Sequence, residues 1–188
     1  MNILKITVVT CCLVISSWIP GILPGYAAIQ EDVDYLIETK ECPICVLSEA
    51  DLSSQDLSNA DMKISDLTGA NLTDADLSGA NLFSTYLMGA TLTNADLSGA
   101  NLASSDLSEA DLSNTNLTGA NLANCLLLDA NLTGATLKNI YWAGAILKGT
   151  NLSDADLRGV KLKGINLTDA KLCNTVMPSG EIATRDCL

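Results

Sequence analysis

Large apolar residues recur at every fifth position through most of this chain. Steps of five from Leu52 to Leu172 give 25 positions, of which 23 are Leu and the other two are Met62 and Trp142. A straight α-helix would turn each successive Leu by about 140° and scatter them over its surface, and a flat strand would put alternate Leu on opposite faces. The period fits neither element and indicates a solenoid of short repeats.

The slot two residues after each centre predicts a turn in every repeat. All ten glycines between residues 46 and 176 occupy it, and Asn, Asp or Ser commonly fill it elsewhere, as at Asp74. These residue types tolerate a positive φ or stabilise turns locally. A chain that turns every five residues would point one Leu and one small residue inward on each side. Trp142, with Ile140 where Ala is usual, would overfill so narrow a core, so we expect a local bulge there.

The repeats closely resemble those of the pentapeptide-repeat family, whose motif is A(D/N)LXX. The motif appears as ANLTD at residues 70–74, ADLSG at 75–79 and ANLTG at 130–134, and the resemblance covers about residues 45–177. In that family four repeats form one square coil, and the coils stack as a right-handed quadrilateral β-helix. The resemblance implies an all-β solenoid of about six coils over residues 46–177, about 30 Å long at a strand spacing of about 4.8 Å.

The first residues predict an exported chain. Residues 1–27 carry one charge, Lys5, and a mostly apolar run followed by small residues, which is typical of a secretory signal peptide cleaved before Ala28. The alternative is a retained membrane anchor, but an apolar run of about 17 residues is at the short limit for spanning and no basic flank follows it. We expect no stable membrane insertion after cleavage.

Both ends of the solenoid are expected to be capped. An open β-helix leaves unpaired backbone groups at its ends, and residues 28–45 predict a short capping helix and a lead-in to the first coil. The apolar face of this helix would consist of Ile29, Val33, Leu36 and Ile37. The terminal LCNTVMPSG resembles the caps of secreted cyanobacterial members, which makes residues 178–188 the expected C-terminal cap. The expected compartment is the periplasm or the thylakoid lumen.

Five cysteines remain after the expected cleavage. Cys173 and Cys187 bracket the last loop and are candidates for a disulfide in an exported chain. For Cys42 and Cys45, in a Cys-Pro-Ile-Cys motif, we weigh a capping disulfide, two reduced structural thiols and a redox site. Zinc is poorly supported because the chain has no His. Cys125 takes an inward small-residue slot and is expected to be a buried structural thiol.

Composition argues against catalysis and against nucleic acid as a partner. The absence of His removes the commonest general base, and the Asp side chains recur as repeat positions instead of converging on a cleft. We therefore expect no enzymatic activity and no cofactor. Removing residues 1–27 takes away one of 10 basic residues and none of the 22 acidic ones, which leaves a net charge of −13. Such a surface disfavours nucleic acids and anionic membranes.

Stacking of residues 20 apart would place Asp56, Asp76 and Asp96 in one column. Carboxylates about 5 Å apart repel one another by something like 1 kcal/mol per pair in water. The column is either a cation-binding ridge or a solvated acidic face that discourages aggregation.

The same stacking separates two hydroxyl-lined sides, those of Leu52 and Leu57, from two apolar sides, those of Leu82 and Leu87. On the apolar sides Leu126 should lie directly over Ile146. Exposed apolar surface marks an interaction site, and the alternative is ordinary packing between neighbouring β side chains. The candidate interaction surface consists of Phe83, Tyr86, Met88, Leu126, Leu128, Tyr141 and Ile146.

The leading interpretation is a noncatalytic exported scaffold or protein-binding rod whose partner is an unknown protein or a second copy. The resemblance offers a rival, an acidic mimic of duplex DNA that inhibits a topoisomerase, as some family members do. The expected signal peptide argues against it because gyrase is cytoplasmic. A third possibility is a thiol-disulfide redox protein that uses Cys42 and Cys45.

Overall fold

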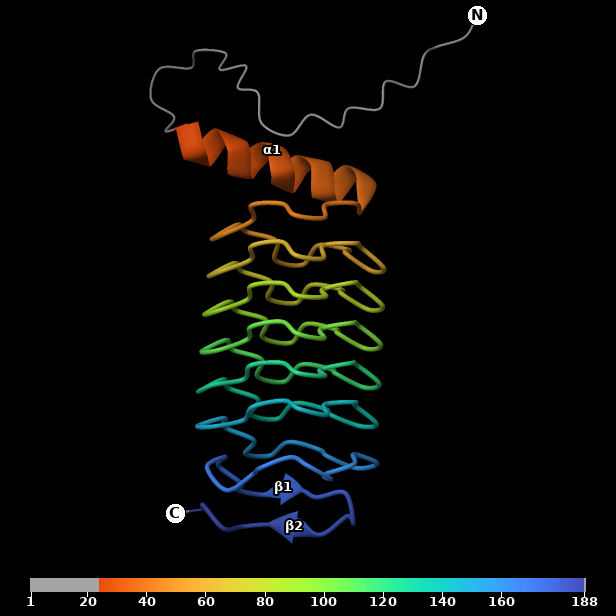
Figure 1. Ribbon diagram of the computed structural model, residues 1–188, viewed down its shortest axis with the longest axis vertical. Helices are drawn as coiled ribbons and strands as arrows, with labels where there is room; N and C mark the ends of the chain where they lie inside the picture. Colours follow the sequence, from red (N-terminus) through yellow and green to blue (C-terminus); the bar gives the residue numbers. More distant parts are fainter. Residues whose placement is uncertain (1–23, 188) are drawn as a thin grey trace, which may run out of the picture.

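The computed structural model describes residues 24–187, so the expected signal peptide lies outside the described residues except for its last four. A helix lies across one end of a rod of stacked coils, and a small hairpin lies at the other end (Figure 1). Helix α1 spans Pro24–Thr39 and begins before the expected cleavage point at Ala28. Strands β1 (Thr175–Val176) and β2 (Ile182–Ala183) form the antiparallel hairpin.

Single parallel β-bridges hold the coils of the rod together. They join residues 20 apart, beginning at Glu41 and ending at Val176. Twenty residues are four repeats of five, so each coil has four sides and each side collects every fourth repeat. We name the sides after one central residue each, in their order around the coil: the Leu52 side, the Leu57 side, the Leu82 side and the Leu87 side. The Leu57 and Leu87 sides therefore lie opposite each other.

A tight turn separates each side from the next. After Leu52, the Gln55 N–H donates to the Leu52 carbonyl at 3.3 Å, and Ser54 between them has a φ of 56°. Gly79 takes the same place at another corner with a φ of 67°. A positive φ at the third of four residues defines a type II turn. The slot that the sequence fills with Gly, Asn, Asp and Ser is therefore the residue that turns the chain.

The interior is filled by the central Leu residues and by small side chains, mostly Ala, that point inward beside them. Where a hydroxyl or thiol replaces Ala, it finds an acceptor inside the rod. Ser105 Oγ donates to the Leu82 carbonyl at 2.6 Å, and Cys125 Sγ donates to the Leu102 carbonyl at 2.7 Å. Within residues 24–187 no buried side-chain nitrogen or oxygen lacks a partner. The rod therefore contains a solid core with its polar groups satisfied.

On two of the four sides, the regular pairing between coils stops where Trp142 replaces Leu. Its buried indole Nε1–H donates to the Lys161 carbonyl at 3.2 Å. One coil earlier, the Leu122 backbone N–H makes the equivalent bond to the Tyr141 carbonyl, so the indole takes the acceptor that the Trp142 backbone would use. Among the described residues, bridges on the Leu82 and Leu87 sides end at Tyr141 and Ile146, while the other two sides continue. A local bulge was expected here; the structure instead shows lost pairing between coils on these two sides.

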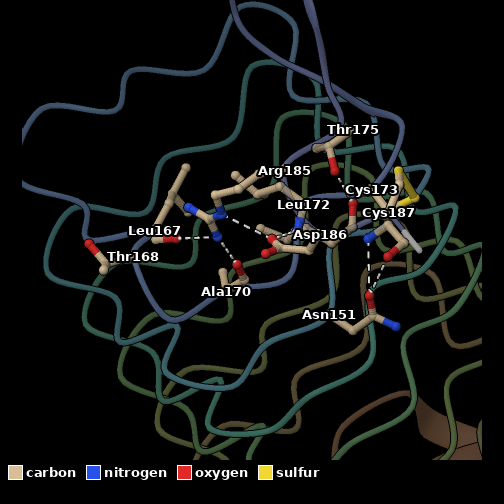
Figure 2. A network of polar contacts seen from close by, with 12 residues as sticks. Asn151, Leu167, Thr168, Ala170, Leu172, Cys173, Thr175, Arg185, Asp186 and Cys187 are labelled. Carbon is tan, nitrogen blue, oxygen red and sulfur yellow. Dashed lines mark hydrogen bonds and ion pairs between the residues drawn. A yellow bond between two sulfur atoms is a disulfide. The ribbon is translucent and has the colours of Figure 1, made fainter.

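An aspartate bonds a backbone N–H at each end of the rod. At the first coil, Oδ2 of Asp32 in α1 accepts the Val46 N–H at 2.7 Å, and the face of α1 toward the rod buries Val33 and Leu36. At the last coil, Asp186 Oδ2 accepts the Leu172 N–H at 2.8 Å (Figure 2). The Val46 N–H has no preceding coil to bond and the Leu172 N–H has no following one, so each carboxylate takes the place of a missing carbonyl.

Arg185 and a disulfide complete the C-terminal end. The Arg185 guanidinium donates to the carbonyls of Leu167 and Ala170 and lies 3.0 Å from Asp186 (Figure 2). The structure joins Cys173 to Cys187, with a Cα–Cα distance of 4.8 Å, as the sequence predicts. The last loop is therefore tied back to the rod by one covalent bond and several charged hydrogen bonds.

Candidate functional site

Exposed large apolar side chains gather on two adjoining sides of the rod. Between residues 41 and 176, every one of them lies on the Leu82 side or the Leu87 side, including the corner between the two. They are Ile44, Val46, Ile64, Phe83, Tyr86, Met88, Tyr141 and Ile146. We call these residues, with Leu126 and Leu128, the apolar face. It is the structural feature that departs most clearly from the repeat.

The sequence correctly places most of this face. Tyr86 is 58% exposed and Tyr141 is 61% exposed, and the predicted stacking of Leu126 on Ile146 is a parallel bridge. Leu126 and Leu128 differ from the expectation because both are half-buried instead of exposed. Their neighbours along the rod cover part of them, so their contribution to a contact surface is smaller than their size suggests.

The apolar face is interrupted by charge. On the Leu87 side the bridged column runs Val46, Asp66, Tyr86, Asp106, Leu126, Ile146. The carboxylates of Asp66 and Asp106 thus interrupt the apolar members of this column at two levels. A partner must meet an alternation of apolar and acidic groups, not a continuous hydrophobic strip.

Three exposed apolar residues of this face were not predicted from the sequence. Ile64 occupies a turn slot with a φ of 60°, where a β-branched residue is unusual, and its N–H donates to the Phe83 carbonyl at 2.9 Å. Ile44 occupies the equivalent slot one coil earlier, and Val46 begins the next side. The signal was present in the sequence, because Ile stands where Gly, Asn, Asp or Ser is the rule.

The Leu52 and Leu57 sides carry polar ladders that are satisfied internally. Asp51 Oδ1 accepts the backbone N–H of Ser53 at 3.2 Å and the Asn71 side-chain amide at 3.0 Å. The same arrangement recurs further along, where the Asn131 amide donates to Asp111 at 2.9 Å. These side chains already use their hydrogen-bonding groups within the rod, which leaves the apolar face as the stronger candidate for contacts with another molecule.

The column of Asp56, Asp76 and Asp96 exists, since bridges join its members in succession. Each carboxylate is used locally: Asp76 and Asp96 accept the N–H two residues later, at 2.9 and 2.8 Å. The Lys40 ammonium, 2.7 Å from Asp56, lowers the pKa of that carboxyl below its ordinary value. Within residues 24–187 no group of three or more acidic or cysteine side chains has the geometry to hold a metal ion. The geometry favours the solvated acidic face.

Cys42 and Cys45 form a disulfide between the end of α1 and the first coil, with a Cα–Cα distance of 5.5 Å. Cys42 is fully buried and follows the C-terminus of α1 in the chain. A reactive cysteine instead needs exposure, and a helix N-terminus or a neighbouring cation that lowers its pKa. The geometry therefore favours the capping disulfide over the redox site. Cys125 is free and buried, and burial raises the pKa of its thiol to about 12.

Charge is distributed unevenly along the rod. Residues 28–137 contain 17 acidic and 2 basic residues, a net charge of −15. Residues 138–188 contain 5 acidic and 7 basic residues, a net charge of +2. The rod therefore has a strongly acidic N-terminal part and a weakly basic C-terminal end. No helix within residues 24–187 is both long enough and apolar enough to cross a membrane.

Comparison with known proteins agrees with this architecture. The family described as pentapeptide repeats matches residues 45–82, 85–124 and 125–164. No curated protein matches the chain.

Several solved structures of pentapeptide repeat proteins are similar. HetL, involved in heterocyst differentiation regulation in the cyanobacterium Nostoc sp. strain PCC 7120, is 35% identical, with 76% of this chain and 78% of HetL covered and a TM-score of 0.38. A protein from the Arabidopsis thaliana thylakoid lumen is 36% identical, with 56% of this chain and 70% of that chain covered and a TM-score of 0.29. QnrB1, a plasmid-mediated fluoroquinolone resistance protein, is 20% identical, with 64% of this chain and 76% of that chain covered and a TM-score of 0.41.

The family match spans well over half of the chain and coincides with the bridged coils. The chain belongs to the pentapeptide repeat family, whose fold is a right-handed β-helix.

Proposed function

We propose that this protein is a noncatalytic, exported interaction module that binds another protein through its apolar face. The observation that carries the proposal is the confinement of all exposed large apolar residues of the rod to two adjoining sides. Exposed apolar residues scattered at random would need no explanation, but a concentration on one part of the surface marks a contact site. The rod supplies a rigid support, because each coil is bonded to the next along its sides.

The noncatalytic part of the proposal rests on how the polar groups are used. Asp side chains along the rod accept backbone N–H groups or the amides of neighbouring Asn residues, so they serve the turns and ladders. The lining of the shallow depression formed by Lys138, Asn139, Arg158 and Gly159 contains no Ser, Thr, Cys or carboxylate side chain. Asp156 lies 3.2 Å from Lys138 and 2.6 Å from Arg158, which partly neutralises both cations.

Export and capping form the second part of the proposal. Two disulfides in one small chain fit an oxidising compartment, as in the periplasm or the thylakoid lumen. We place α1 as the cap of a rod of about six coils. The bond from Asp32 to the Val46 N–H supports this role, because it occupies an edge group that another β-strand would otherwise reach.

Two other functions fit the molecule less well. A mimic of duplex DNA needs negative charge along its whole length, but residues 138–188 carry a net charge of +2. A redox protein using Cys42 and Cys45 needs an accessible sulfur at a helix N-terminus or beside a cation, but Cys42 is fully buried and the half-buried Cys45 follows the C-terminus of α1. Inhibition of DNA supercoiling by gyrase, or reduction of insulin that is lost on Cys42→Ser, would favour one of these functions over the present proposal.

The decisive experiment is to crosslink the protein to its partner in the native compartment. Capture of that partner is then compared between the wild type and the double variant Leu126→Lys/Leu128→Lys. Capture of a specific partner should fall by about tenfold or more, since a charged residue in a buried contact commonly costs 2 kcal/mol or more. The matched control is Ser78→Lys/Ser98→Lys, which adds the same two charges on the opposite Leu57 side. If both double variants fold and capture the same partner equally well, the apolar face is not the docking site.

A further inference from the structure

We propose that the occupant of the Leu87 side is a second copy of this chain, packed antiparallel about a two-fold axis at the level of Asp106. This inference rests on the proposed docking role of the apolar face and names the partner for one of its two sides. The argument depends on the order of residues along that side and on the distribution of charge along the rod.

The Leu87 side has two outward columns, one before and one after each central residue. Consider a two-fold axis that lies in the contact plane, at right angles to the length of the rods. It places each column opposite the same column of the second copy and reverses the order of the coils. With the axis at Asp106, the coil of Tyr86 and Met88 faces the coil of Leu126 and Leu128 in the second copy. Tyr86 then meets Leu126 in the first column, and Met88 meets Leu128 in the second. The projecting, exposed pair thus lies over the half-buried pair.

The next coils outward add a charge pair. The coil of Asp66 and Thr68 faces the coil of Ile146 and Lys148 in the second copy. Lys148 is exposed and lies beside Asp66 across the contact, within reach of its flexible side chain. Because the axis repeats every contact, the dimer contains this pair twice.

The distribution of charge along the rod favours the antiparallel arrangement over the parallel one. With the axis at Asp106, antiparallel packing places residues 138–171, which include 6 basic and 3 acidic residues, at the level of residues 41–74 of the other copy, which include 7 acidic residues and 1 basic residue. Parallel packing would instead place the acidic parts side by side and repel. The opposite Leu57 side offers no comparable contact, because its outward columns carry Asp56, Asp76 and Asp96 and no exposed large apolar residue.

The size of the contact sets its strength. Five steps of about 4.8 Å separate Val46 from Ile146, so the side is about 24 Å long and roughly 10 Å wide, the spacing of packed sheets. Two such faces bury less than the 1,200 Å² or so at which stable interfaces begin. The dimer is therefore a weak one that forms at high local concentration. Asp106 weakens it further, because the two copies of this carboxylate meet at the axis.

The repulsion at the axis gives the sharpest test. Asp106→Asn should tighten self-association of the processed chain by about tenfold, measured by sedimentation equilibrium up to millimolar concentration. Asp76→Asn is the matched control, since both Asp106 and Asp76 accept the N–H two residues later, at 3.0 and 2.9 Å, on opposite sides of the rod. Lys148→Asp should weaken the dimer about threefold, and adding Asp66→Lys should restore it.

A cysteine at the axis provides a readout independent of affinity. Asp106→Cys should form a disulfide-linked dimer under mild oxidation much faster than Asp76→Cys. Equal crosslinking of the two variants, or a wild-type chain and an Asp106→Asn variant that both stay monomeric, would overturn the second copy as occupant. In that case, loss of partner capture by Leu126→Lys/Leu128→Lys would still support the proposed function with a different protein as partner. Unchanged capture and unchanged self-association together would refute both.

Discussion

Truncation of a central Leu to Ala should destabilise the rod by very different amounts before and after Trp142 along the chain. Leu102 and Leu162 occupy the same column of the Leu82 side. Leu102 is fully buried, and its N–H donates to the Asn121 carbonyl at 2.8 Å in a coil paired on all sides. Leu162 is half-buried, in a segment where the described residues show no bridge on this side.

We expect Leu102→Ala to lower the free energy of unfolding by about 3 to 4 kcal/mol, because its side chain leaves a cavity between two rigid coils. Leu162→Ala should cost only about 1 kcal/mol, since part of its surface is already in water and the loosely paired segment can collapse. Urea titration followed by Trp142 fluorescence gives the free energy of unfolding of both variants and of the wild type. The dependence of this free energy on urea concentration should be the same in all three proteins. An equal loss of unfolding free energy in both variants would refute the reasoning that lost pairing after Trp142 loosens the core there.

Further outcomes concern the cysteines and the C-terminal end. Cys173→Ser with Cys187→Ser should lower the free energy of unfolding by about 3 kcal/mol, the chain-entropy value for a loop near 15 residues, and thermal melting would detect it. Cys125, whose thiol pKa is raised by burial to about 12, should resist alkylation in the native state and react only after unfolding, as mass spectrometry would report. The Leu172 N–H lowers the pKa of Asp186, so its stabilising effect should be present above about pH 4 and disappear as the pH falls through the lower folded value. In Asp186→Asn this acid-induced loss should be smaller in pH-dependent melting, and an unchanged profile would contradict the assignment.

Much of the fold was predictable because the repeat is a local property. The choice of Leu, Ala and turn residues every five positions determines which side chains point inward, and the positive φ at Ser54 and Gly79 follows from it. The predicted stacking of Leu126 on Ile146 also holds, because the register of 20 residues is four unbroken repeats. The apolar face was predicted less completely, since Ile44 and Ile64 stand at turn slots that were interpreted only as corners.

What the sequence by itself determined is a rod with an apolar, small-residue core and chemically distinct sides. Only the tertiary structure decided how the ends are closed and where the pairing stops. Asp32 meets the Val46 N–H, and the Trp142 indole takes the Lys161 carbonyl, through contacts between segments 14 and 19 residues apart that no five-residue period contains. The period describes short-range preferences of the backbone, whereas these bonds depend on which polar groups remain unpaired once the coils have stacked.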